Sequence, residues 1–168
     1  ALISRGKAMI AAEGVIDTFP VRVPMVDVNS IGAGGGSIAW LDAAGSLKVG
    51  ALSAGSEPGP ACYARGGELP TVTDASLVLG YIDPDYFAGG MLKLEPELAR
   101  QAIEKHIAKP LGMSVEQAAL GIHRVVNANM AEGIRLISVG RGIVPRNFSL
   151  LALGGGGAVH ANALAREL

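Results

Sequence analysis

Short apolar runs separated by turns dominate the first third of the chain and predict strands. The expected strands lie in residues 2–10 (two strands around Arg5-Gly6-Lys7), 21–28, 37–41 and 47–49. The last two are joined by a turn at residues 42–46, which is typical of a hairpin. Glycines and prolines then punctuate residues 50–73 so closely that a long loop is expected. Residues 1–73 are thus predicted to be rich in strands and loops.

Helical signals dominate residues 74–168. Asp74 is expected to cap a short helix at 75–79, and Pro96 is expected to open a helix that runs to about His106, with Pro110 and Gly112 closing it. Ser114 and Gln117 match a capping box, which predicts a long helix over residues 115–139. A buried strand at 149–153, four glycines and a helix at 158–168 follow. This order of elements predicts an α/β or α+β fold.

Composition and charge remove several classes of function. The chain has 168 residues and a formal net charge of −1, so no electrostatic case exists for binding nucleic acid or an anionic membrane. No apolar run is long enough for a membrane span. Cys62 is the only cysteine, which excludes an internal disulfide and a zinc site built from several cysteines. A reducing, cytoplasmic location fits this composition best.

Common catalytic motifs fail when they are tested against the chain. Gly6-Lys7 is followed by Ala8, so it is not a phosphate-binding P-loop. Ser37 stands where the dinucleotide fingerprint that begins at Gly32 needs its third glycine. The spacing around Ser53 is one residue too long for a nucleophile elbow. Simple GTPase, dehydrogenase and serine hydrolase interpretations are therefore disfavoured.

The long predicted helix carries a polar stripe opposite its apolar face. At about 100° per residue, one side consists of Arg124, Asn127, Ala131, Arg135 and Ser138. Guanidinium, amide and hydroxyl groups around a small residue could grip a nucleotide base and ribose. The alternative is an ordinary solvated helix face, which the residues alone favour.

Two glycine clusters supply the other candidate sites. Gly154, Gly155, Gly156 and Gly157 place bare backbone before a helix, where phosphate or nucleotide can approach, or where a helix and a strand can pack closely. Gly34 lies in a second cluster at residues 32–36, for which a glycine-rich turn in a sheet is the simpler explanation. Asp74 could face a cleft instead of capping a helix. No catalytic residue and no metal ligand is assigned.

Five segments taken together resemble a known family. They are residues 23–28 (Val-Pro-Met-Val-Asp-Val), 30–39 (with Gly-Ala-Gly-Gly-Gly), 53–63 (with Pro-Gly-Pro-Ala-Cys-Tyr), 70–75 and 153–161 (Leu-Gly-Gly-Gly-Gly-Ala-Val-His-Ala). They closely resemble the A-type subunit of the hydantoinase/oxoprolinase family, which includes N-methylhydantoinase, 5-oxoprolinase and acetone carboxylase subunits. The resemblance covers residues 1–168 as a single fragment of a longer protein.

The resemblance implies an actin-like ATPase fold, in which two ribonuclease-H-like lobes close on ATP and Mg²⁺. Such folds use two phosphate loops of the Asp-x-Gly-Gly-Thr type, and none occurs in this chain. The second of these loops is expected just upstream of Ala1. Gly154–Gly157 match the adenosine motif of the second lobe, with Arg135 and Asn127 as further contacts. The isolated chain is therefore expected to be inactive.

The resemblance also implies a reaction and a partner. ATP would phosphorylate the carbonyl oxygen of a hydantoin or of a ring like 5-oxoproline, and water would then open the cyclic amide, often with a B-type subunit. In the carboxylase branch, phosphorylated bicarbonate and a ketone-derived enolate are joined instead. A third alternative is a non-catalytic scaffold lobe whose glycines only pack and which binds the B-type subunit.

Overall fold

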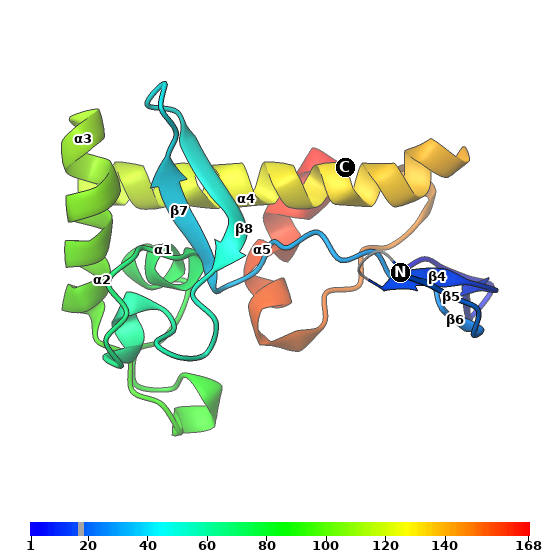
Figure 1. Cartoon of the computed structure of the whole chain (residues 1–168), viewed down its shortest axis with the longest axis horizontal. Coiled ribbons are helices and arrows are strands. Elements are labelled where there is room, and N and C mark those ends of the chain that lie inside the picture. The colour runs from blue at the N-terminus through cyan, green and yellow to red at the C-terminus, as the bar shows by residue number, and fades with distance from the viewer. Residues whose placement is uncertain (17–18) are drawn as a thin grey trace.

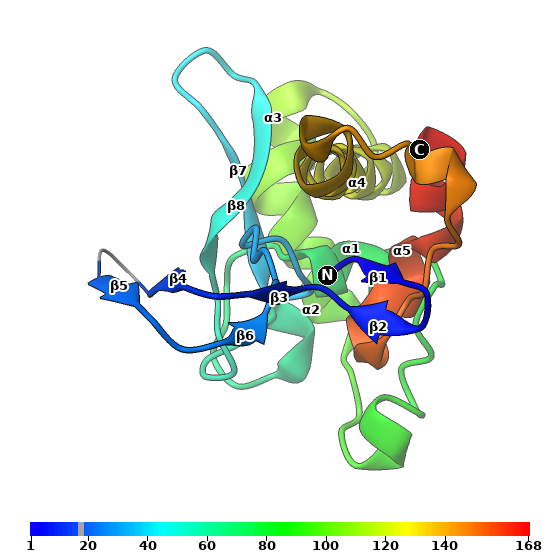
Figure 2. The same ribbon diagram turned by 90° about the vertical axis from the view of Figure 1, so that its right-hand side faces the viewer.

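The computed structural model describes residues 1–16 and 19–168, and the first part of it is a set of small two-stranded sheets. Three antiparallel pairs form there: β1 (Ile3–Ser4) with β2 (Lys7–Ala8), β3 (Ile10–Ala11) with β6 (Met25–Val26), and β4 (Gly14–Ile16) with β5 (Phe19–Val21). Figures 1 and 2 show these strands below the C-terminal end of the longest helix.

The strand expected at residues 21–28 is interrupted in the structure. Val21 belongs to β5 and Met25–Val26 form β6, which pair with different partners, while residues 22–24 and 27–28 are not in a strand. Pro24 lies in this interruption, because proline has no N–H to donate to a neighbouring strand. The two strands expected around Arg5-Gly6-Lys7 are confirmed.

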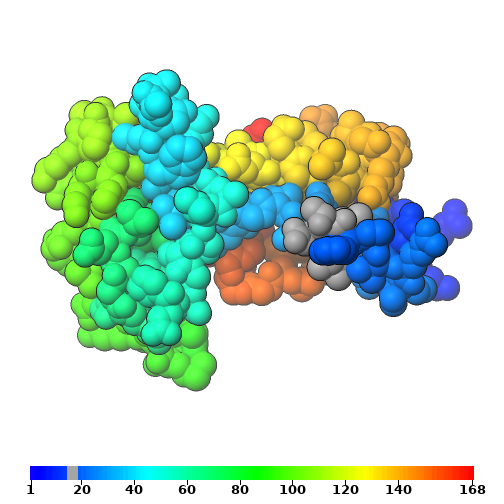
Figure 3. All heavy atoms as spheres, in the orientation of Figure 1, coloured from blue at the N-terminus to red at the C-terminus, as the bar shows by residue number. Residues whose placement is uncertain are grey.

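The predicted hairpin after the first glycine cluster is confirmed and forms one wall of the core. β7 (Ser37–Leu41) pairs antiparallel with β8 (Leu47–Ser53), which extends four residues further than expected. The inner side of this hairpin packs on helices α1, α2 and α4 through Ala39 and Val49. Figure 3 shows the bulk of the molecule gathered around this region.

Helix α1 (Val72–Val78) begins differently from the prediction. Its N-cap is Thr71 rather than Asp74, and the two side chains form a reciprocal capping box. The Thr71 hydroxyl accepts from the Asp74 N–H, while the Asp74 carboxylate accepts from the Thr71 N–H at 2.8 Å. Asp74 therefore occupies the third helical position, where a carboxylate is also favoured by the helix dipole.

The helix that begins at Pro96 is longer than expected. α2 (Pro96–Ile103) continues through a π turn (Glu104–Ala108) into α3 (Lys109–Leu111), and Gly112 ends it with a φ of 63°. The helix thus continues past the end expected near His106, whereas the expectation that Gly112 closes it is confirmed. The π turn widens the helix directly before Pro110, which lacks the N–H that a regular α-helix would use there.

The long helix is confirmed and is the axis of the molecule. α4 (Val115–Ser138) opens with the predicted capping box, in which Ser114 and Gln117 bond each other's backbone N–H groups. Its apolar face buries Ala118, Ile122 and Val126 against α1, α2 and the β7–β8 hairpin. Figure 1 shows α4 running along the length of the molecule, with α5 (Gly154–Glu167) crossing its other side.

The strand predicted at residues 149–153 is not formed. The segment is extended where it joins α5, but it belongs to no strand, and Leu151 and Leu153 are 68% and 75% exposed. A strand needs a neighbour for its N–H and C=O groups, and no described strand lies in register with this segment. The four glycines are also not a linker, because they form the first turn of α5.

The loop at residues 32–36 is held to α1 by close backbone approach. Thr73 donates from its backbone N–H and its hydroxyl to the Gly35 carbonyl, at 2.8 and 2.9 Å. A Cβ at Gly35 would lie 2.7 Å from the Thr73 hydroxyl oxygen, whereas one at Gly34 would meet no atom within 4 Å. Packing therefore explains Gly35, and it does not explain Gly34.

This contrast makes a prediction about stability. Gly35→Ala should lower the free energy of unfolding by about 1–3 kcal/mol, because the new methyl group forces apart the loop and α1. Gly34→Ala is the matched control and should change it by less than about 0.5 kcal/mol. Urea denaturation of both variants measures the difference. Equal stability of the two variants would contradict this account of the loop.

Candidate functional site

The glycine turn Gly154–Gly157 is an uncapped helix end with open space around it. Helix α5 runs 14 residues from Gly154, and no side chain bonds its first N–H groups. A Cβ built at any of the four glycines would have no atom of the described chain within 4 Å. The φ of 78° at Gly154 itself favours glycine there, whereas neither backbone conformation nor contacts within the described residues account for glycine at positions 155–157. Bare N–H groups at the positive end of a helix dipole suit an anionic ligand.

The polar stripe of α4 lies against α5. Asn127 bonds the His160 ring, with its amide oxygen 2.7 Å from Nδ1. Arg135 donates to the Glu167 carbonyl oxygen at 2.8 Å and lies 3.3 Å from the Glu167 carboxylate. Ala131, between them on the same face, is fully buried. Arg124 at the start of the stripe is exposed to solvent, whereas Asn127, Ala131 and Arg135 lie against the helix that carries the glycine turn.

A pair of buried histidines joins α1, α4 and α5. The rings of His123 on α4 and His160 on α5 are stacked, with centroids 4.8 Å apart and planes 22° apart. Both residues are 3% exposed. The Nε2 atom of His123 lies 2.8 Å from the Ser76 hydroxyl of α1, and Tyr81 meets the His123 ring edge-on at 5.1 Å.

The hydrogen bonds determine which ring nitrogens carry protons. The Ser76 hydroxyl donates to the Val72 carbonyl, so it accepts from Nε2 of His123. The Asn127 amide oxygen can only accept, so His160 donates from Nδ1. Burial, and then the nearby His160 ring, lower the pKa of His123 to about 4. Burial also lowers the pKa of His160. The stack therefore holds two neutral rings at neutral pH.

Gly34 belongs to a separate, shallow hollow. The hollow has a volume of about 440 Å³ and is lined by residues 29–34, 36 and 37 together with Ala51 and Ser53. The Gly34 N–H is held by the Ser37 hydroxyl at 3.0 Å, and that hydroxyl donates to the Gly32 carbonyl. The lining offers small polar groups and backbone but no charged side chain.

The Asp74 side chain is buried beneath the surface. Its carboxylate accepts from the N–H groups of Ala61 and Cys62, at 3.2 and 2.8 Å, and from both the N–H and the hydroxyl of Thr71. The residue is fully buried, as is Cys62, whose thiol pKa is raised by burial and then by the Asp74 charge. Asp74 thus ties the Pro60-Ala61-Cys62 turn to α1 and does not line a cleft here.

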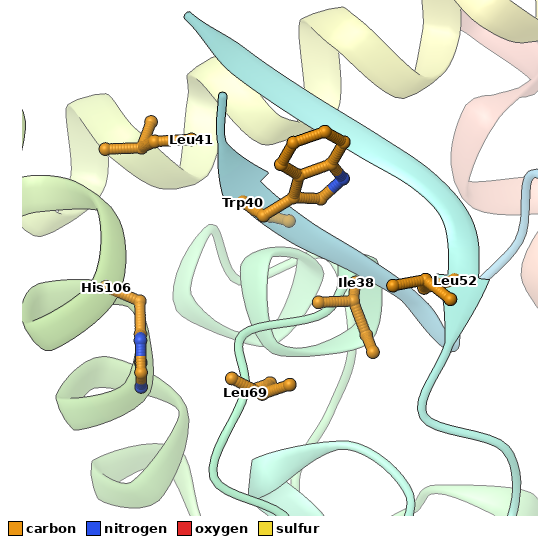
Figure 4. Close-up of a pocket in the computed structure, with 7 residues that line it drawn as sticks. Ile38, Trp40, Leu41, Leu52, Leu69 and His106 are labelled. Atoms are coloured by element: carbon orange, nitrogen blue, oxygen red, sulfur yellow. The ribbon is translucent and has the colours of Figure 1, made fainter. Parts of the chain in front are cut away.

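A second hollow, of about 390 Å³, lies outside the β7–β8 hairpin (Figure 4). Its walls are apolar and include Ile38, Trp40, Leu52 and Leu69, with His106 of the π turn at one side. Nε2 of His106 is buried without a hydrogen-bond partner, and burial lowers the pKa of this ring. A single imidazole among apolar walls provides a binding surface but no set of catalytic groups.

Within residues 1–16 and 19–168, no group of three or more His, Cys, Asp or Glu side chains could hold a metal ion. In the same residues no helix is both long enough and apolar enough to cross a membrane.

The sequence did not reveal the histidine pair. His123 and Asn127 are four residues apart on one helix, which places them on one face. This spacing can be read from the sequence, but it does not identify α5 as the helix that packs on this face of α4. The stack forms because residues 139–153 carry the chain back along α4, so that α5 packs against it. The spacing of residues on α4 alone does not contain that information.

Removing the charge of Asp74 should destabilise the fold. Asp74→Asn replaces one acceptor oxygen with an NH₂ group that faces backbone N–H donors, so unfolding should become easier by about 2–4 kcal/mol. Asp83→Asn is the control, since Asp83 accepts one exposed hydrogen bond from Asp85. Chemical denaturation of both variants measures the loss. Unchanged stability of Asp74→Asn would refute the structural role.

The histidine pair predicts a dependence of stability on pH. Because the folded pKa of His123 lies below the usual 6.5, its contribution is complete above pH 6.5 and is lost as the pH falls toward about 4. This one residue should account for about 3 kcal/mol of that loss. His123→Gln keeps a donor for Ser76 and does not titrate, so it should flatten the stability profile between pH 6.5 and 4. An unchanged slope would contradict the burial of a neutral ring.

Comparison with known proteins places the whole chain in one family. The family model described as hydantoinase/oxoprolinase matches residues 1–168. The alpha subunit of caprolactamase from Pseudomonas jessenii is 50% identical over 150 residues, which are 89% of this chain and 22% of that protein. The 5-oxoprolinase 1 of Arabidopsis thaliana is 38% identical over 164 residues, covering 88% of this chain and 13% of the relative.

Solved structures agree with the sequence comparison. A nucleotide-free structure of acetone carboxylase matches with a TM-score of 0.88 at 35% identity, over 98% of this chain and 23% of that one. A crystal structure of the ATP-dependent caprolactamase from Pseudomonas jessenii matches with a TM-score of 0.85 at 47% identity, over 94% and 23%. The chain thus spans between 13% and 23% of the length of these relatives. It belongs to the hydantoinase/oxoprolinase family.

Proposed function

We propose that this chain is part of an ATP-dependent enzyme that opens a cyclic amide, and that it supplies the adenosine side of the ATP site. The observation that carries the proposal is the glycine turn Gly154–Gly157, an open and uncapped helix end that no internal packing requires. The names of similar proteins support ATP as the nucleotide, since both matched structures are described as ATP-dependent. An actin-like arrangement of two lobes around ATP is part of the same proposal.

The residues present fit the adenosine and α-phosphate side of a nucleotide. Without side chains, the first turn of α5 leaves room for a ribose or a base to lie against the backbone, and its free N–H groups suit phosphate oxygens. The family's Asp-x-Gly-Gly-Thr phosphate loops do not occur in the chain. We therefore assign the β- and γ-phosphates, and Mg²⁺ with them, to residues other than those described.

Within this proposal the chain contributes binding and orientation. When bound, ATP supplies the phosphoryl group that turns an unreactive amide carbonyl into a reactive one. The glycine turn holds the nucleotide at its adenosine end, while Asn127 and Arg135 hold α5 on α4. Fixing one reactant in this way lowers the entropic cost of bringing phosphate and carbonyl together. Gly34, in its shallow hollow, remains a candidate contact, and Asp74 supports the fold beneath.

The proposed substrate class is a lactam or a related cyclic amide. Identity is 50% to a caprolactamase subunit, which supports a lactam, compared with 47% to the acetophenone carboxylase gamma subunit and 37% to the acetone carboxylase beta subunit. The carboxylase branch remains the alternative, because the acetone carboxylase structure has the higher TM-score. Several relatives are named as subunits, which supports a B-type partner subunit for the complete protein.

The nucleotide proposal is tested by one substitution and its control in the full-length protein. Gly155→Asp should weaken ATP binding by roughly tenfold or more, because a carboxylate would occupy the proposed phosphate position. An acidic residue in the first turn stabilises a helix, so the loss would not come from unfolding. Gly140→Asp, at another glycine with open space, is the control. Equal ATP affinities of the parent and Gly155→Asp, by calorimetry, would refute the proposal and favour a scaffold role.

The substrate class is tested by ADP release from the full-length protein with its partner subunit. Caprolactam, 5-oxoproline and hydantoin are compared with acetone plus bicarbonate. Release that depends on a cyclic amide, with appearance of the ring-opened amino acid, is expected. Release that depends only on the ketone and bicarbonate would assign the protein to the carboxylase branch.

A further inference from the structure

Helix α5 has few anchors for an element that carries the proposed nucleotide site. Only His160 and Leu164 of its 14 residues are buried. Its C-terminal end is held by the Arg135 guanidinium, which bonds the Glu167 carbonyl and carboxylate. A cation at this end also suits the negative end of the helix dipole. His160 is thus the buried side chain nearest to the glycine turn, three residues beyond Gly157.

His160 is itself held on two sides. Nδ1 donates to the Asn127 amide oxygen at 2.7 Å, and the ring face lies on His123. His123 is in turn bonded to Ser76 of α1, whose hydroxyl is fixed to the Val72 carbonyl. A continuous series of contacts therefore joins α1 and α4 to the first half of α5. Each side chain in it is at least partly buried, so water does not readily replace the bonds.

We propose that His160 is a positioning residue, which holds the glycine turn Gly154–Gly157 in place through its hydrogen bond to Asn127 and its stack on His123. This inference rests on the proposed function and changes the role of Asn127. The amide oxygen of Asn127 is engaged by His160, so Asn127 acts on the nucleotide through α5 rather than by gripping the ribose. Nucleotide affinity then depends on a residue pair that faces away from the ligand.

The test is a double-mutant cycle on ATP binding in the full-length protein. His160→Phe keeps a ring on His123 and removes the donor to Asn127, and Asn127→Leu removes the acceptor. Each should weaken ATP binding roughly tenfold, and the double variant should be no weaker than either single one. Losses that multiply to roughly a hundredfold would show independent action and overturn the proposal. Unchanged affinity in His160→Phe would also overturn it.

A conservative variant separates positioning from general damage to the fold. In His160→Asn the side-chain NH₂ lies near the former Nδ1 position and can still donate to Asn127. It should restore most of the ATP affinity that His160→Phe loses. The control is His106→Phe, which alters the third histidine, outside the stack, and should leave affinity unchanged. Failure of His160→Asn to exceed His160→Phe in affinity would contradict a role for the hydrogen bond.

Hydrogen exchange distinguishes failure of this inference from failure of the proposed function. If the unsubstituted full-length protein does not bind ATP, the proposed function is wrong. Amide exchange at residues 154–160 then still tests whether His160 holds the glycine turn in place. Exchange there should be faster in His160→Phe and Asn127→Leu than in the parent and in His106→Phe. Equal exchange in all four proteins would overturn the positioning claim.

Discussion

The attachment of α5 to the polar face of α4 is the interaction on which the functional account depends. Asn127 and Arg135 hold the two halves of α5 through His160 and Glu167, and the buried stack of His160 on His123 extends this contact to α1. Without that attachment, the four glycines would be a flexible segment with no fixed direction. With it, they become an oriented helix end whose N–H groups point at one place.

The attachment of α5 to α4 depends in turn on the hydrophobic core that holds α4 and α1 in place. Ile122 and Val126 fix α4 against the helices and the β7–β8 hairpin, while the buried Asp74 carboxylate ties the turn at residues 60–62 to α1. Ser76, on the same short helix as Asp74, carries the hydrogen bond to His123. Asp74, which the sequence offers as a site residue, is thus a structural residue. By fixing α1 it also fixes Ser76, and with it the position of the histidine pair.

Local signals in the sequence predicted the elements with strong chemical markers. The capping box at Ser114 and the hairpin at residues 37–53 are confirmed because each depends on residues near in sequence. The helix end near His106 was wrong, since a π turn accommodates Pro110, and the strand at residues 149–153 was wrong, since no described strand pairs with it. The polar stripe of α4 could be recognised from the spacing of its residues. Its partner, α5, could not, because the path of the chain through residues 139–153 decides which helix packs on the stripe.

The central claim is that nucleotide lies against the first turn of α5. Its most direct test is an experimental structure of the full-length protein with a non-hydrolysable ATP analogue. The account predicts that backbone atoms of Gly154–Gly157 contact the adenosine or the α-phosphate, with His160 still stacked on His123. An analogue bound with no atom of this turn in van der Waals contact would contradict it.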